Sequence, residues 1–287
     1  MTDPPPYELM GWNPTLHNQN DLDQIDAIPF LPSLVADRPA PYRYPWNIAK
    51  TYNEGQHLPN TVQLSSDCVA AACAVVIANL DCIEHAPGNP KWTPHHAHIA
   101  WIYGVARVRI GGGRLHGPGA TGLWGARAIT EHGHARQNDP GINTYTANLS
   151  ETWGERPGPP ETWDPVAKRR IAKRLERCSN VAHVKAALLS GRMLTIASAR
   201  GFQLEPTNFD GYNCFVPSGS WSHQMSLIAW IDAPFPAAYR QNTWGPSYHA
   251  PQLRGEPPGG AWNLAQDLEE ELSWPETECY AYSVLAE

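Results

Sequence analysis

The stretch that most constrains the fold is "CVAAACAVVIANL", residues 68–80, which follows the polar step Ser65-Ser66-Asp67. It contains neither Pro nor Gly, and Ser66 or Asp67 can act as an N-cap, so the pattern predicts a helix that begins at Cys68. Because the run is apolar on nearly all sides, we expect this helix to be buried between other layers. The sequence therefore places a thiol in the first turn of a core helix.

The composition supports a packed interior and excludes some classes of function. Of the 287 residues, 42% are hydrophobic and only 17% are charged, which argues against disorder. The formal net charge of -7 makes a nucleic-acid-binding protein improbable. The densest basic run, residues 168–178, is expected to be a solvated helix face rather than a phosphate-binding patch.

Targeting signals and cysteine spacing indicate where the protein works. The sequence has no run of 18 consecutive apolar residues, and its first residues lack the basic and apolar regions of a secretory signal. The six cysteines show no tight spacing, so we expect free thiols in a reducing compartment. The expected location is cytoplasmic, and a particle released from a cell would be the exception.

The pattern along the chain predicts an α+β protein with two lobes. Residues 1–60, rich in Pro, Asp and Asn, are expected to form an extended N-terminal arm over the body. Residues 61–163 are predicted to form a helical lobe and residues 164–287 a β lobe. Further helices are expected over residues 93–108 (N-cap Thr93), 123–133, 164–178 and 181–191, and strands over residues 192–199, 226–232, 238–244 and 279–285.

Three residues in chain order suggest nucleophilic chemistry. A helix N-terminus stabilises a thiolate, so Cys68 is well placed to attack a carbonyl, although a single Cys on an apolar helix is more often a core residue, as expected for Cys73. His223 precedes one predicted strand, and Asn242 lies on the next. A Cys nucleophile needs a His to hold its proton, and the His needs a polar partner to fix its ring.

The order Cys, His, Asn and the strand "QNTWGPSY" resemble the papain-like cysteine peptidases, in particular their divergent bacterial and phage-type branch. "SDCVAAA", "IGGGRLHGPGATGLWGARAITEHG" and "VAHVKAALLSGRMLTIAS" resemble further pieces of that family in the same order, over about residues 60–285. The resemblance implies a papain-like two-lobe fold, with an antiparallel β-barrel-like second lobe and the active-site cleft between the lobes.

The resemblance also implies the role of each site residue. The catalytic residues would be Cys68, His223 and Asn242, supported by Trp244 and Gly245, with Gln63 in the oxyanion hole. The substrate cleft would include Gly119, Ala120, Thr121, Gly122 and Ser222. No cofactor or metal is implied, and the partner would be a peptide or protein substrate.

Some positions depart from the family pattern. Gln63 lies five residues before Cys68 instead of six, Val69 replaces a common aromatic residue, and Ser65 replaces a disulfide-forming Cys. Gln224 replaces the small residue that usually follows the His. Residues 1–60 contain no recognisable inhibitory prosegment, so the arm covers the cleft, or the enzyme needs no inhibitor, or there is little activity to restrain.

Other signals carry less weight. The histidines of "HHAH" and "HGH" (His95, His96, His98, His132, His134) lack a neighbouring carboxylate or Cys at ligand spacing and are expected to be surface or cap residues. The acidic run at residues 267–272 is expected to be a solvated helical turn rather than a calcium site.

The sequence is compatible with two classes of function. The first is a thiol peptidase, or a related amide hydrolase. The second is a papain-fold structural or binding component with little or no turnover. An example would be a component of a phage virion, whose partners would be other virion proteins. A peptidoglycan amidase of another Cys–His fold is a weaker third candidate, because it would not need the Asn-x-Trp-Gly strand. A scaffold has no need for an intact Cys, His and Asn, which favours the first.

Overall fold

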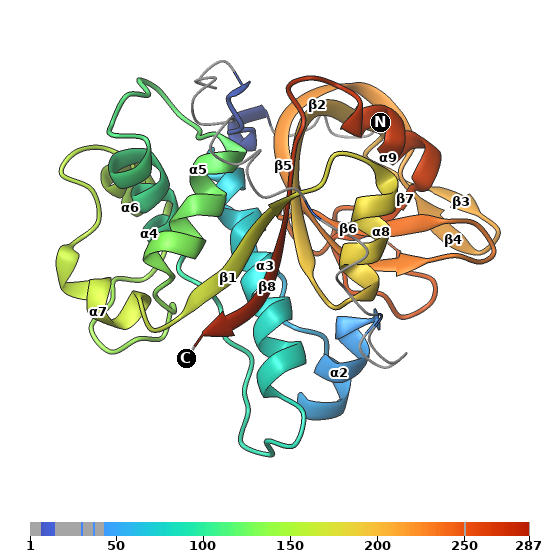
Figure 1. Cartoon of the computed structure of the whole chain (residues 1–287), viewed down its shortest axis with the longest axis horizontal. Coiled ribbons are helices and arrows are strands. Elements are labelled where there is room, and N and C mark those ends of the chain that lie inside the picture. The colour runs from blue at the N-terminus through green and yellow to red at the C-terminus, as the bar shows by residue number, and fades with distance from the viewer. Residues whose placement is uncertain (1–6, 15–29, 31–36, 38–42, 250, 287) are drawn as a thin grey trace.

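The structure is a computed structural model that describes residues 7–14, 30, 37, 43–249 and 251–286. Figure 1 shows helices α4–α7 on one side of the long helix α3, and most of the sheet on the other. The helices are α2 (Pro45–Tyr52), α3 (Cys68–His85), α4 (Ile99–Gly104), α5 (Gly122–Arg127), α6 (Ala147–Trp153), α7 (Asp164–Ala167), α8 (Val181–Leu189) and α9 (Ala265–Leu272). Short 3-10 helices lie at Tyr7–Leu9 and Glu161–Trp163, and π-helical turns at Val105–Ile110 and Ala128–His132.

The predicted core helix is confirmed as α3, in which every residue from Cys68 to Ile83 is buried. Its length and mean hydropathy of 1.6 would suit a membrane span, but 89% of it is enclosed by the rest of the protein, as in the core helix of a globular domain. Its many alanines let neighbouring elements approach closely. One end of this helix is therefore held rigidly inside the molecule, and that end carries Cys68.

The sheet confirms the α+β class. Its strands are β1 (Ile171–Arg177), β2 (Met193–Phe202), β3 (Thr207–Phe209), β4 (Tyr212–Cys214), β5 (Pro217–Ile231), β6 (Ala237–Gln241), β7 (Gly260–Leu264) and β8 (Glu278–Ala286). Their order is β1-β8-β2-β5-β6-β7-β4-β3, antiparallel except between β4 and β7. The described strands thus form an open sheet with two edges, rather than a closed barrel.

The sheet is covered on both faces. Helix α3 packs on β2, β5 and β8, and tight hydrogen bonds join it to β5: Ser226 Oγ donates to the Ala72 carbonyl at 2.9 Å, and Gln224 Nε2 to the Val69 carbonyl at 3.3 Å. The other face packs against α8 and α9. The central strand β5 is therefore fixed against the start of α3, where the thiol lies.

Three local predictions were wrong. Residues 164–178 are not one helix: α7 ends at Ala167, and Ile171–Arg177 form the edge strand β1, because pairing with β8 satisfies their backbone. Residues 93–97 are not helical; backbone bonds to Ala135 and Gln137 hold them extended, and the side chain of His98, not of Thr93, caps α4. Part of the predicted arm, residues 1–60, lies outside the described residues; within the described part, residues 45–52 are not extended, because α2 packs Trp46 and Ala49 into the core.

The acidic run at residues 267–272 is helical as predicted, but it is not simply solvated. Glu271 of α9 is fully buried and forms a bidentate ion pair with Arg240 of β6, with N···O distances of 2.5 and 3.1 Å. Ser198 of β2 also donates to this carboxylate. A buried charge needs such partners, so this pair ties α9 to the sheet.

Candidate active site

The structure brings His223 and Asn242 together. Strands β5 and β6 pair with Ser226 opposite Gln241, which places His223 on β5 beside the end of β6. His223 Nε2 lies 2.8 Å from Asn242 Oδ1, and both side chains are buried. The Trp244 ring packs on His223 at a centroid distance of 4.7 Å and an angle of 37°. This ring excludes water from the histidine–asparagine hydrogen bond.

Cys68 is the first residue of α3, and its thiol faces the backbone of the residue that follows His223. Backbone amides of Gln224 and Gly11 face its thiol, and Gln224 directly follows His223. His223 Nδ1 is buried and has no hydrogen-bond partner among the described residues. The ring therefore keeps one nitrogen uncommitted while the other is held by Asn242.

Burial keeps the thiol and the imidazole neutral in this arrangement. Burial raises the pKa of Cys68 to about 12, against a smaller lowering by backbone amides. Burial also lowers the pKa of His223 to about 4, although its bond to Asn242 acts in the opposite direction. The expected thiolate is therefore not favoured here, because loss of water outweighs the field of the helix N-terminus.

The N-terminal arm contributes to the burial of Cys68, because the backbone of Gly11 faces its thiol. Residues 7–14 of the arm, which we call the cleft segment, lie beside α5 and β5 and appear as the dark blue ribbon in Figure 1. Trp12 N donates to the Ser222 carbonyl at 3.1 Å on one side. On the other side, Ala120 N donates to the Gly11 carbonyl at 2.8 Å, and Asn13 N donates to the Ala120 carbonyl at 3.0 Å. The segment therefore bridges two elements that border Cys68.

Gly11 is the residue that lets the cleft segment come so close. A Cβ atom at position 11 would lie only 1.9 Å from the carbonyl oxygen of Ser66. The opposing Gly119 has a φ of +96°, and a Cβ atom there would lie 2.4 Å from the carbonyl oxygen of Gly11. Glycine is thus required on both sides of this contact. Gly119 is among the cleft residues expected from the sequence, whereas Gly11 is not, because its only signal there is a glycine between Met10 and Trp12.

Trp12 anchors the cleft segment. Its indole is 3% exposed, and its Nε1 donates to Glu278 Oε2 at 2.6 Å. The same carboxylate accepts from the backbone amides of Gly122 and Leu123, at 2.7 and 2.6 Å. Glu278, at the start of β8, was not expected from the sequence as a site residue. It joins the β sheet, the start of α5 and the arm at one point.

Gln63 lies at the other end of the cleft segment. Its Nε2 donates to the Leu9 carbonyl at 2.6 Å and to the Ser65 carbonyl at 3.0 Å, while its Oε1 accepts from Thr243 Oγ1 at 2.6 Å. The side chain is 2% exposed. Its amide thus binds a peptide carbonyl of the arm, the kind of contact that an oxyanion-hole donor makes.

The remaining predicted cleft residues lie around the cleft segment. Gly119 to Gly122 form the wall opposite β5, where Thr121 also caps α5 by accepting from Trp124 N at 3.1 Å. Ser222 contributes its backbone carbonyl. Gly245 follows the strand end with a φ of +117°, which suits glycine.

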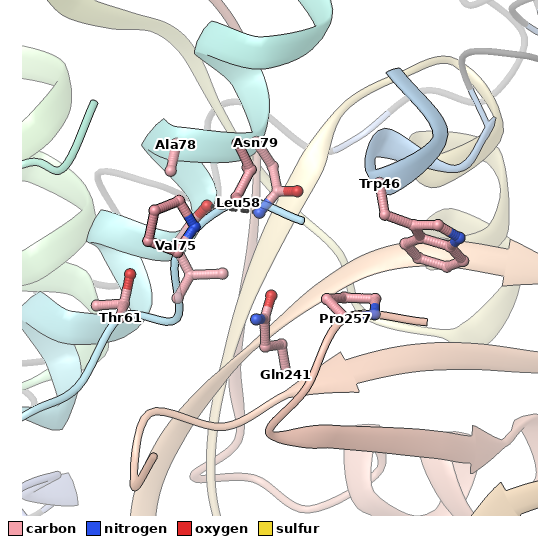
Figure 2. A pocket seen from close by; sticks show the side chains of 9 residues that line it. Trp46, Leu58, Thr61, Val75, Ala78, Asn79, Gln241 and Pro257 are labelled. Carbon is pink, nitrogen blue, oxygen red and sulfur yellow. Dashed lines mark hydrogen bonds between the residues drawn. The ribbon is translucent and has the colours of Figure 1, made fainter. Parts of the chain in front are cut away.

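One hollow borders the cleft segment, and a second lies between α2, α3 and β6. A pocket of about 620 Å³ opens beside the cleft segment on the helical side, lined by Glu8, Leu9, Leu64, Ser65, Ser66, Tyr103, Arg107, Gly117, Pro118, Glu151 and Glu155. Figure 2 shows a second pocket, where Asn79 of α3 and Gln241 of β6 belong to the lining. Its volume of about 20 Å³ suits a single water, so only the first could hold part of a peptide.

The histidines set aside in the sequence analysis are not all surface residues. His98 caps α4, as described above. His134 is 2% exposed, and burial lowers its pKa to about 3. Among the described residues, no three His, Cys, Asp or Glu side chains gather as a metal site would require.

Comparison with solved structures gives the fold. The chain is similar to xylellain, a cysteine protease from Xylella fastidiosa, at a TM-score of 0.58 and 14% identity, over 99% of each chain. The chain has a papain-like fold. It is also similar to procathepsin B S9 from Trypanosoma congolense (TM-score 0.51, 11% identity, 97% of this chain and 84% of that one). A ragweed pollen cysteine protease in its proform gives a TM-score of 0.55 at 11% identity, over 92% of this chain and 74% of that one.

No protein-family model and no curated protein matches the chain by sequence. The papain-like fold is thus recognised through its architecture. At these identities the solved structures speak for the fold, and the chemistry has to be argued from the residues of this chain.

Proposed function

We propose that the protein is a thiol peptidase that hydrolyses peptide bonds through Cys68, His223 and Asn242. The observation that supports this most strongly is the buried His223–Asn242 hydrogen bond beside the first residue of α3, within a papain-like fold. A structural protein would not need an imidazole with one nitrogen held and the other uncommitted.

The reaction would proceed in two steps. In the first, the Cys68 sulfur bonds to the peptide carbonyl carbon while His223 takes the thiol proton and passes it to the leaving amine, whose C–N bond breaks. In the second, water attacks the thioester, the C–S bond breaks, and a carboxylic acid and the free thiol result. Asn242 orients the ring, and the Gln63 amide with the Cys68 backbone N–H would bind the oxyanion.

The cleft segment would keep this enzyme latent. It covers Cys68, occupies the Gln63 amide and fills the space at Glu278 with Trp12. The similar structures include a ragweed pollen cysteine protease in its proform and a procathepsin B, which fits a covered cleft here. The alternative of a scaffold, for example in a virion, would leave the cleft covered permanently.

Thiol labelling of a variant with a displaced arm tests the proposal. Gly11→Ala cannot fit against the Ser66 carbonyl, so it should displace the cleft segment, including Trp12, while leaving α3 and the sheet unchanged in sequence. We expect an epoxide inhibitor of papain-like proteases to label Cys68 selectively among the six thiols, at least ~10-fold faster in Gly11→Ala than in the native chain. Mass spectrometry of the adduct gives the site and the rate.

The control is Glu8→Ala, because the Glu8 side chain is exposed on the same segment. It should label at the native rate. Equal and slow labelling of all thiols in Gly11→Ala, with the arm shown to be released by its accessibility to proteolysis, would reject the peptidase and leave the structural or binding role.

A further inference from the structure

His249 lies behind the candidate catalytic pair, where neither the mechanism nor the family pattern described above uses it. Its Nε2 is 3.0 Å from Asn242 Nδ2, and its Nδ1 is 3.0 Å from the Leu204 carbonyl oxygen. The side chain is 2% exposed. Together with the His223–Asn242 bond, these contacts form one buried chain from a backbone carbonyl to the imidazole beside Cys68.

The chemistry of the groups gives each hydrogen bond a direction. A carbonyl oxygen only accepts, so His249 Nδ1 must carry the proton and donate it to Leu204. The lone pair of His249 Nε2 then accepts a hydrogen bond from Asn242 Nδ2. This turns Asn242 Oδ1 toward His223 Nε2, where Thr243 N also donates to it at 2.7 Å. His223 therefore carries its proton on Nε2 and presents a basic Nδ1.

The backbone at position 249 supports a use for this side chain. His249 has a φ of +58°, in the left-handed region where glycine is favoured and most side chains are disfavoured. A glycine would relieve this conformation but would remove the acceptor from Asn242. A strained position that keeps a side chain is a reason to look for a function of that side chain.

We propose that His249 is a positioning residue, which holds the Asn242 amide in the orientation that makes His223 a base toward Cys68. This rests on the proposed peptidase function. His249 acts through Asn242 and touches no reacting atom.

The surroundings keep His249 in the required neutral form. The Phe215 ring packs edge-on to it at a centroid distance of 4.7 Å, and Trp244 and Tyr248 lie on other sides. Burial lowers the pKa of His249 to about 4, so its Nε2 lone pair persists at neutral pH. An apolar side chain of similar size would pack there equally well but would leave Asn242 Nδ2 buried without an acceptor.

Two substitutions separate positioning from packing. In His249→Gln, the side-chain oxygen can reach the place of Nε2 and accept from Asn242. In His249→Asn, the side chain is one methylene shorter and ends near the place of Nδ1. Asn tolerates a positive φ well, so this variant should fold at least as readily as the Gln variant. Both are made in the full chain carrying Gly11→Ala, in which the cleft is open.

We expect His249→Asn to lower the rate of Cys68 labelling about 10-fold, the effect of one weakened hydrogen bond, and His249→Gln to stay within about 3-fold of the parent. In an Asn242→Ala background, His249→Asn should cause no additional loss, because its effect passes through Asn242. A packing role would instead lower the thermal midpoint and would add to the loss caused by Asn242→Ala.

The ring proton of His223 gives a readout that needs no activity. In the native chain, ¹⁵N-resolved NMR should detect a slowly exchanging Nε2 proton on His223 in a hydrogen bond. It should be retained in His249→Gln and exchange at least ~10-fold faster in His249→Asn. Equal exchange and equal labelling in the two variants would overturn the role of His249. Failure of the Gly11→Ala parent to label Cys68, with its arm shown to be released by proteolysis, would reject the peptidase proposal alone, and the NMR comparison would still decide whether His249 orients Asn242.

Discussion

At the scale of single residues, the environment of Cys68 matters more than its position on the helix. The helix N-terminus favours a thiolate, but the thiol is fully buried under the cleft segment, and its pKa rises to about 12. Asp67, directly before it, is also buried and accepts hydrogen bonds from Ser150 and Tyr145. The same residues should become reactive when water and substrate replace the arm.

The proposed roles predict different losses at Cys68 and Asn242. In the Gly11→Ala chain, Cys68→Ala should abolish hydrolysis of a labelled denatured protein and keep the fold, because Ala suits the buried helix start. Asn242→Ala should reduce hydrolysis by roughly 10–100-fold, since it orients the base and does not attack. Full activity of Cys68→Ala would refute the nucleophile, and equally complete loss in a folded Asn242→Ala would refute the orienting role.

At the scale of elements, a short segment far from the site in sequence completes its packing. Backbone pairing joins the cleft segment to Ala120 and Ser222, and Trp12 joins it to Glu278. These contacts use the edges of α5 and β5, which border Cys68. The arm can therefore leave without breaking a helix or the sheet.

We predict that Trp12 supplies most of the docking energy of the arm. Replacing a buried Trp by Ala typically costs about 3–5 kcal/mol, so Trp12→Ala should expose the segment to limited proteolysis and accelerate Cys68 labelling. Trp12→Phe keeps an aromatic ring but loses the N–H that donates to Glu278, so it should label Cys68 at an intermediate rate. Unchanged proteolysis in Trp12→Ala would show that backbone pairing alone holds the arm.

At the scale of the whole molecule, polar groups are enclosed between α3, the sheet and the outer helices. His134, His223 and His249 are each 2% exposed, with pKa values lowered by burial to about 3, 4 and 4. The unfolded chain would bind protons at these sites near pH 6.5, as an unperturbed His does. Between about pH 6.5 and 4 the unfolded state therefore binds more protons than the folded state.

The protein should consequently lose stability as the pH falls through this range. Each fully buried histidine lowers the free energy of unfolding by on the order of 3 kcal/mol once the pH has fallen to its pKa in the folded state. Burial raises the pKa of Asp67, so the folded state takes up a proton there first, which offsets part of this loss. Urea unfolding at pH 7 and pH 4.5 measures the change. His134 lies outside the site, and His134→Gln should reduce the number of protons taken up on unfolding by about one, so that the free energy of unfolding depends less on pH. An unchanged slope of this free energy against pH would show that His134 is not held neutral by burial.

Much of the fold could be predicted because local pattern and tertiary structure agree. The unbroken apolar run of α3 can be stable only inside a core, and the apolar strands β2, β5, β6 and β8 need neighbours on both faces. Where a segment has mixed preferences, the prediction failed. Residues 171–177 carry helix-forming Lys, Arg and Leu, yet the free edge of β8 makes them a strand, whose exposed positions carry Lys173 and Arg174.

The candidate site, too, could be predicted from the sequence only in part. The sequence by itself determined which chemistry is possible, because thiol, imidazole and amide occur in an order and in local settings that resemble one family. Only the tertiary structure decided that Gly11 lies against the thiol, that Glu278 binds Trp12 of the arm, and that His249 bonds to Asn242. These contacts join residues that are distant in sequence or lie in irregular loops, where no periodic pattern predicts them. Their geometry follows from how α3 packs against β5.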